Sequence, residues 1–150
     1  MKIQEPEVFK LEYISNQKLN LVKPKILGFI CNWCGYGAIE SITMAKQQYP
    51  TNVKLIRVLC SGKIERKLIL ESLLNGIDGV IIITCNFGNC HYMDGNVQCY
   101  KRVEAIKNLV QDLGIDNRRI KFQTIRASEG DKLANILTDF INEIKTLLNY

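Results

Sequence analysis

Short apolar runs and helical patterns alternate along the chain from Lys25 onward. The apolar runs cover residues 26–30, 53–59, 79–84 and 119–125. A segment whose apolar residues recur at three- and four-residue spacing follows each run, as in an amphipathic helix. The run at 79–84 is continuous and rich in β-branched residues, which is typical of a central parallel strand. This alternation predicts an α/β domain with a four-stranded parallel sheet.

The helical segments are predicted at 38–48, 64–74, 97–113 and from 128 to the end of the chain. Gly76 and Gly114 are typical helix ends, and Ser128 is expected to be the N-cap of the last helix. Right-handed crossovers place helices on both faces of such a sheet. We therefore expect a three-layer, flavodoxin-like or Rossmann-like fold with strand order 2-1-3-4.

Residues 1–24 show no sustained hydrophobic period and contain Pro6 and Pro24. We expect an extended N-terminal arm over 1–24, with a short strand at 8–13. The remaining residues, 25–150, are predicted to form one cysteine-rich domain. A chain of 150 residues can bury a core without disulfide bonds.

The composition is ordinary for a globular protein, with 47% hydrophobic and 23% charged residues. No apolar stretch reaches the roughly 18–20 residues that cross a bilayer, and the N-terminus has no secretion signal. We therefore expect a cytoplasmic protein with no membrane partner. The net charge is +5, but no aromatic residues are interleaved with the basic clusters, so nucleic acid is not an expected partner.

Five of the six cysteines follow the ends of the apolar runs. They are Cys31, Cys34, Cys60, Cys85 and Cys90. Because the carboxyl ends of parallel strands meet at one edge of a sheet, these thiols are expected to converge there. Cytosolic thiols are normally reduced, so such a group indicates metal or redox chemistry rather than disulfides. Cys99 lies inside a helical pattern and is expected to pack in the core.

The residues alone leave three thiol chemistries open. An iron–sulfur cluster needs four thiolates, which five cysteines can supply with one to spare. A sulfur donor set also suits zinc, although zinc usually takes closely spaced ligands. Cys31 and Cys34 form a C-x-x-C between a strand and a helix, as in dithiol oxidoreductases, where the helix dipole lowers a thiol pKa. That third alternative gives the other three cysteines no role.

The loop at 31–37 has neither G-x-G-x-x-G spacing nor a Walker lysine, so nucleotide binding is not expected. Trp33 lies between two cysteines and is interpreted as a shield of the site, a partner contact or a core residue. His91, the only histidine, directly follows Cys90 and is interpreted as a hydrogen-bonding loop residue.

Several separate segments resemble the iron–sulfur (delta) subunit family of methyl-viologen-reducing hydrogenase. The matching segments are Cys31-Asn32-Trp33-Cys34, Tyr49-Pro50, Arg57-Val58-Leu59-Cys60-Ser61-Gly62, Gly79-Val80, Cys85-x-x-Gly88-x-Cys90-His91-Tyr92, Gly95-Asn96 and Ala127-Ser128-Glu129-Gly130. They occur in order over about residues 25–147, without large gaps. Asn86 and Asn89 depart from the family pattern, which commonly has a histidine and an acidic residue there.

The resemblance implies an electron carrier of anaerobic archaea and bacteria, in systems that include methanogenesis. One 2Fe–2S cluster would be bound by four of the five matched cysteines, and the sequence does not select which four. The chain would relay electrons from a hydrogenase, or in some systems a formate dehydrogenase, to the flavin-containing subunit of heterodisulfide reductase. That subunit bifurcates the electrons. On this interpretation the chain is not itself catalytic.

Overall fold

The computed structural model describes residues 23–150. The predicted strand at 8–13 and nearly all of the predicted arm lie outside the described residues. The strands are β1 (Ile26–Cys31), β2 (Val53–Val58), β3 (Gly79–Cys85) and β4 (Ile120–Ile125). They form one parallel sheet in the order β2-β1-β3-β4, which confirms the predicted fold class and strand order.

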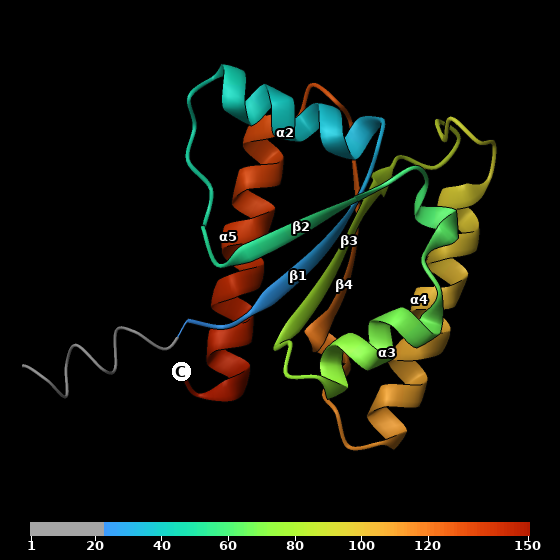
Figure 1. The fold of residues 1–150 in the computed structure, drawn as a ribbon, viewed down its shortest axis with the longest axis vertical. Helices are drawn as coiled ribbons and strands as arrows, with labels where there is room; N and C mark the ends of the chain where they lie inside the picture. Colours follow the sequence, from blue (N-terminus) through green and yellow to red (C-terminus); the bar gives the residue numbers. More distant parts are fainter. Residues whose placement is uncertain (1–22) are drawn as a thin grey trace, which may run out of the picture.

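Helices cover both faces of this sheet (Figure 1). The helices are α2 (Cys34–Met44), α3 (Arg66–Leu74), α4 (Gly95–Asp112) and α5 (Gly130–Leu148), with single 3-10 turns η1 (Ser61–Lys63) and η2 (Asn117–Arg119). One face packs against α2 and α5, and the other against α3 and α4. None of the helices in residues 23–150 combines the length and the apolar character needed to span a membrane.

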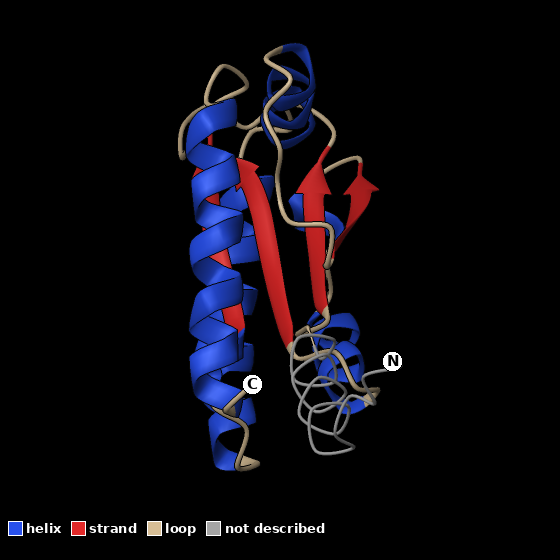
Figure 2. Cartoon of the chain, turned by 90° about the vertical axis from the view of Figure 1, so that its left-hand side faces the viewer, coloured by secondary structure: helices blue, strands red, loops and turns tan. Residues whose placement is uncertain are grey.

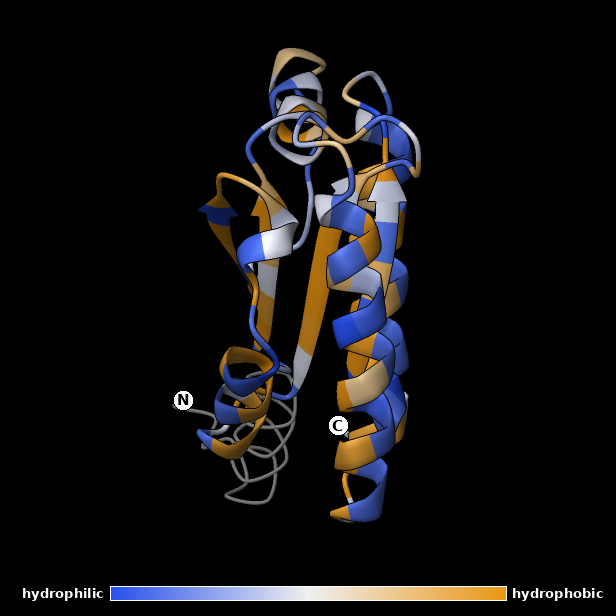
Figure 3. Ribbon diagram, turned by 90° about the vertical axis from the view of Figure 1, so that its right-hand side faces the viewer, coloured by the Kyte–Doolittle hydropathy of each residue, from blue (hydrophilic) through white to orange (hydrophobic). Residues whose placement is uncertain are grey.

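The core consists of two layers separated by the sheet. All seven residues of β3 are buried, and its side chains alternate between the layers. Ile81 and Ile83 face α2 and α5, whereas Val80 and Ile82 face α3 and α4. In Figure 3 the strands are mostly orange and the helices change from orange to blue around their axes, as expected for helices with one buried side.

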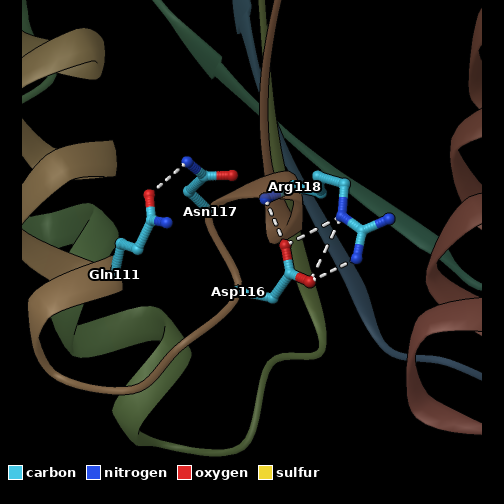
Figure 4. Close-up of polar contacts among 4 residues, drawn as sticks. All are labelled: Gln111, Asp116, Asn117 and Arg118. Carbon is cyan, nitrogen blue, oxygen red and sulfur yellow. Dashed lines mark hydrogen bonds and ion pairs between the residues drawn. The ribbon is translucent and has the colours of Figure 1, made fainter.

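The carboxyl ends of all four strands point to the same end of the molecule (Figure 2). The loops after β1, β2 and β3 therefore meet there, and we call this end the cysteine edge because these loops hold the predicted site. The opposite end includes η2, where the Asp116 carboxylate accepts hydrogen bonds from the backbone and the guanidinium of Arg118 just before β4 begins (Figure 4).

The predicted helix starts differ from the structure by two to four residues, and the differences at α2 and α5 have local reasons. Helix α2 begins at Cys34 rather than residue 38, because Gly35 and Gly37 allow its first turn to lie against the strand ends. Helix α4 begins at Gly95 rather than residue 97. Ser128 is not the N-cap of α5; Glu129 takes that position, and its carboxylate accepts from the Arg126 backbone N–H at 2.8 Å.

Candidate metal centre

Cys31 and Cys85 are the last residues of two neighbouring strands, β1 and β3. Both side chains are buried, and their Sγ atoms lie 3.6 Å apart. Two thiolates held tetrahedrally by one metal ion at about 2.3 Å would stand about 3.8 Å apart. The sheet therefore brings these two sulfurs to the spacing of a chelating pair.

Cys34 joins this pair from the first turn of α2. Its thiol and backbone N–H both interact with the sulfur of Cys85. The next residue, Gly35, donates its backbone N–H to Cys31 Sγ at 3.2 Å. A Cβ at Gly35 would lie 3.3 Å from that sulfur and 3.2 Å from the Ile83 carbonyl, so the start of the helix presses directly on the strand ends.

Cys60 and Cys90 come from loops and form the second group of sulfurs. Cys60 follows β2 and accepts a hydrogen bond from the Gly62 backbone N–H at 3.4 Å. Its thiol interacts with that of Cys90, in the loop after β3. A Cβ on Gly95 would collide with Cys60 Sγ and lie 3.5 Å from Cys90 Sγ. Only glycine at the start of α4 leaves room for both sulfurs.

Side chains that carry no sulfur hold these loops in place. Ser61 Oγ and Thr84 Oγ1 are 2.7 Å apart and buried, so they join the residues beside Cys60 and Cys85. The buried Asn96 amide donates to the carbonyls of Cys85 and Asn86, both at 2.9 Å. Arg102 donates to the Gly62 carbonyl at 2.5 Å and fastens η1 to α4. Arg102 carries no sequence signal for this role.

As the side chains are placed, residues 23–150 contain no group of three or more His, Cys, Asp or Glu that could hold a metal ion. The sulfurs instead form a strand-borne group, Cys31, Cys34 and Cys85, and a loop-borne group, Cys60 and Cys90. A two-iron cluster takes two protein ligands on each iron. The donor type and the grouping fit such a cluster, while the assignment of ligands stays a prediction.

Comparison with known proteins identifies the family. Residues 26–147 match the family model of the delta subunit of methyl-viologen-reducing hydrogenase. The chain is 41% identical over 125 residues to the iron–sulfur subunit of an F420-non-reducing hydrogenase from Methanococcus voltae, covering 83% of this chain and 87% of that protein. The chain belongs to this family. The resemblance of the separate motifs is thereby confirmed.

Two other relatives show the family in different settings. The iron–sulfur subunit of an F420-non-reducing hydrogenase from Archaeoglobus profundus is 40% identical, over 83% of this chain and 91% of its own length. One subunit of the ferredoxin:CoB-CoM heterodisulfide reductase of Methanosarcina mazei is 36% identical over 83% of this chain. The chain spans only 16% of that longer protein. The delta-subunit domain therefore occurs both as a separate chain and within a larger polypeptide.

The thiols of this family member differ in their acidity. The Cys31 thiol and the backbone N–H groups of Cys34 and His91 donate to Cys85 and lower its pKa to about 5. Burial raises the pKa of Cys34 to about 11. The pKa of Cys31 is raised by its hydrogen bond to Cys85 and by burial. Hydrogen bonds thus favour the thiolate of Cys85, whereas burial disfavours that of Cys34.

Cys99 is separate from the five clustered thiols. It is fully buried in α4, within the core layer formed with α3, and burial raises its pKa to about 11. The prediction that Cys99 packs in the core is confirmed. Its thiol also contacts the hydroxyl of Ser61, the residue that follows Cys60.

The outer surface of the cysteine edge is aromatic. Trp33 stacks on His91 with ring centroids 3.7 Å apart, and His91 meets Tyr92 edge-on. Trp33 remains 41% exposed, so the alternative that it is a core residue is wrong. The stack joins the loop after β1 to the loop after β3.

Proposed function

We propose that this chain is a cytoplasmic electron-transfer subunit that binds one 2Fe–2S cluster at the cysteine edge. The ligands are four of Cys31, Cys34, Cys60, Cys85 and Cys90. The chain relays electrons from a hydrogenase, or a formate dehydrogenase, to the flavin-containing subunit of heterodisulfide reductase. It breaks no bonds itself. When bound, such a cluster accepts and releases one electron at a time.

The observation that carries this proposal is the 3.6 Å contact between Cys31 Sγ and Cys85 Sγ at the ends of neighbouring strands. This spacing suits two thiolates on one metal ion. Cys34, Cys60 and Cys90 lie beside the same edge and are the candidates for the remaining ligands. A rigid sheet edge holds the first pair, which suits a centre that should change its geometry little between two redox states.

The surrounding residues provide what an electron-transfer centre requires of its protein. Backbone N–H groups of Gly35 and Gly62 donate to sulfur and offset negative charge on the thiolates. The Trp33–His91 stack links the loops that follow β1 and β3, between which the sulfurs lie. Asn86 and Asn89 place no negative charge beside the site, and fewer negative charges favour the reduced form.

The relatives support the choice of partners. Some carry this domain as the iron–sulfur subunit of a hydrogenase, and others carry it within a longer subunit of heterodisulfide reductase. A domain that is separate in some proteins and part of a redox subunit in others is typical of components that work in one complex. On this basis we place the chain between a hydrogen- or formate-oxidising enzyme and heterodisulfide reductase.

Anaerobic purification followed by visible absorption spectroscopy tests the proposal, with iron and acid-labile sulfide assayed on the same sample. We expect a brown protein with about two irons and two sulfides per chain, bleached by dithionite. A colourless protein that resists reconstitution would contradict it. Bound zinc would then favour a zinc-stabilised adaptor, and titratable thiols on Cys31 and Cys34 would favour a dithiol oxidoreductase.

A further inference from the structure

A cleft of about 340 Å³ opens onto Cys60 at the cysteine edge. Its base is formed by Cys60, Gly62 and Gly95, and the two glycines have no side chains that could cover the sulfur. Cys31 and Cys85 are only 2% and 3% exposed. The cleft therefore gives an approaching molecule access to Cys60, whereas Cys31 and Cys85 are buried.

The walls of the cleft combine apolar and positively charged groups. Leu59 and Tyr92 form the apolar part and are 68% and 47% exposed. Lys63 and Arg102 form the basic part. The one carboxylate among the lining residues, that of Asp94, already accepts a hydrogen bond from Gln98 at 2.8 Å.

Positive charge continues beyond the cleft. Arg102 also lines an adjoining shallow depression together with Glu65, Arg66 and Lys67. The two hollows share Arg102, so the four cations Lys63, Arg66, Lys67 and Arg102 form one basic border on the side of η1 and α3. Three carboxylates lie among or beside them, those of Asp94, Glu65 and Glu71, of which Glu71 pairs with Lys67 at 3.6 Å. The four cations outnumber the three carboxylates, so the local charge is net positive.

We propose that this cleft is the docking site for an acidic segment of a redox partner protein, and that electrons pass through it by way of Cys60. The inference rests on the proposed function. It adds the place where electrons enter or leave the protein and the kind of partner surface that binds there. An apolar side chain of the partner fills the space between Leu59 and Tyr92, while its carboxylates face the basic border. Charge complementarity of this kind raises association rates, and it weakens with salt.

The test measures electron transfer from the dithionite-reduced, cluster-containing protein to two small acceptors by stopped-flow absorption. One acceptor is an acidic blue-copper protein and the other is basic cytochrome c. Each reaction moves one electron, which oxidises the cluster and reduces the Cu(II) or the haem Fe(III). The variant Lys63→Glu/Arg66→Glu reverses two exposed charges of the border and leaves Arg102, which holds the η1 loop, in place.

The matched control, Lys54→Glu/Lys145→Glu, makes the same change in net charge at exposed positions near the opposite end of the sheet. We expect the border variant to lower the second-order rate with the acidic acceptor about tenfold at low salt and to raise the rate with cytochrome c. The second-order rates of the control variant with both acceptors should stay within about twofold of the wild-type rates. Leu59→Ala should lower the rate of electron transfer to the acidic acceptor even at high salt, where electrostatic steering is screened.

The possible outcomes distinguish the electron-carrier function from the docking site. A colourless wild-type protein overturns the proposed function, and this inference with it. A brown protein that transfers electrons, but whose border and control variants behave alike, overturns the docking site while the electron-carrier function stands. Border variants with unchanged visible spectra and selectively slower transfer to the acidic acceptor support both.

Discussion

The two groups of sulfurs in the site are held in different ways. Cys31 and Cys85 end hydrogen-bonded strands and are buried, so the sheet itself fixes their positions. Cys60 and Cys90 lie in loops and are partly exposed, and side chains and glycines from α4 and η1 determine where they stand. The comparison shows that two parts of one site can be positioned differently. Strand pairing fixes Cys31 and Cys85, whereas contacts of individual residues position Cys60 and Cys90.

Replacing a strand-borne sulfur should have the largest effect. We expect Cys85→Ser to lower the iron content at least about tenfold, because the sheet brings no substitute thiol to that position. Cys99→Ser is the control and should keep the wild-type iron content, since its thiol lies in the core layer. Iron analysis and the visible spectrum measure both. A Cys85→Ser protein with two irons per chain would show that Cys85 is not a ligand.

At the loop-borne half, a substitution that crowds the sulfurs should lower the iron content even though every cysteine is retained. Gly95→Ala places a methyl group against Cys60 Sγ, and we expect iron loss approaching that of a ligand substitution. Gly76→Ala is the matched control, with a positive φ of 93° but open space around its Cβ. It should lower the free energy of unfolding by about 1 kcal/mol and leave the iron content unchanged. Equal iron in both variants would contradict the close contact of Gly95 with the sulfurs.

Asn96 connects the two halves, since it holds the loop that leads from Cys85 to Cys90. Asn96→Ala leaves two buried carbonyls without their donor, and we expect about 2–3 kcal/mol less free energy of unfolding. The control is Asn75→Ala, which removes an exposed amide that donates to the Glu71 carbonyl, and it should cost less than about 1 kcal/mol. Urea denaturation measures both. If Asn96→Ala lowers the free energy of unfolding no more than Asn75→Ala does, Asn96 does not hold the loop in place.

The smallest effect is expected at the opposite end of the sheet. The side chain of Arg118 donates to Asp116 and lowers the pKa of that carboxyl. A lowered folded-state pKa stabilises the protein above pH about 4, and that stability is lost as the pH falls through the folded value. Asp116→Asn should therefore lower the free energy of unfolding by less than about 1 kcal/mol at pH 7, because solvent screens the pair, and this difference should narrow as the pH is lowered from 7 toward 2.

Urea denaturation at the two pH values checks this last prediction, and the iron content serves as its internal control. Because Asp116 lies before β4 begins, the cysteine edge should keep its metal at pH 7 in this variant. A loss of iron would indicate that the two ends of the sheet are coupled.

The strand-borne half of the site could be predicted from the sequence, and the loop-borne half only in outline. Continuous apolar runs indicated the strands, and the flavodoxin-like order expected for them placed Cys31 beside Cys85. The closeness of Cys60 and Cys90 depends on the Gly62–Gly95 contact and on Arg102, which are contacts between distant segments with no local pattern. Ser128 was mistaken for an N-cap because Glu129 competes for the same position one residue later.

Neither core layer contains any of the five clustered cysteines. The apolar packing of the sheet and its helices is complete without them, unlike that of a zinc finger, which is unfolded until its metal binds. We therefore expect the polypeptide to fold before any iron binds. Assembly of the proposed cluster would then be a separate step on a folded scaffold.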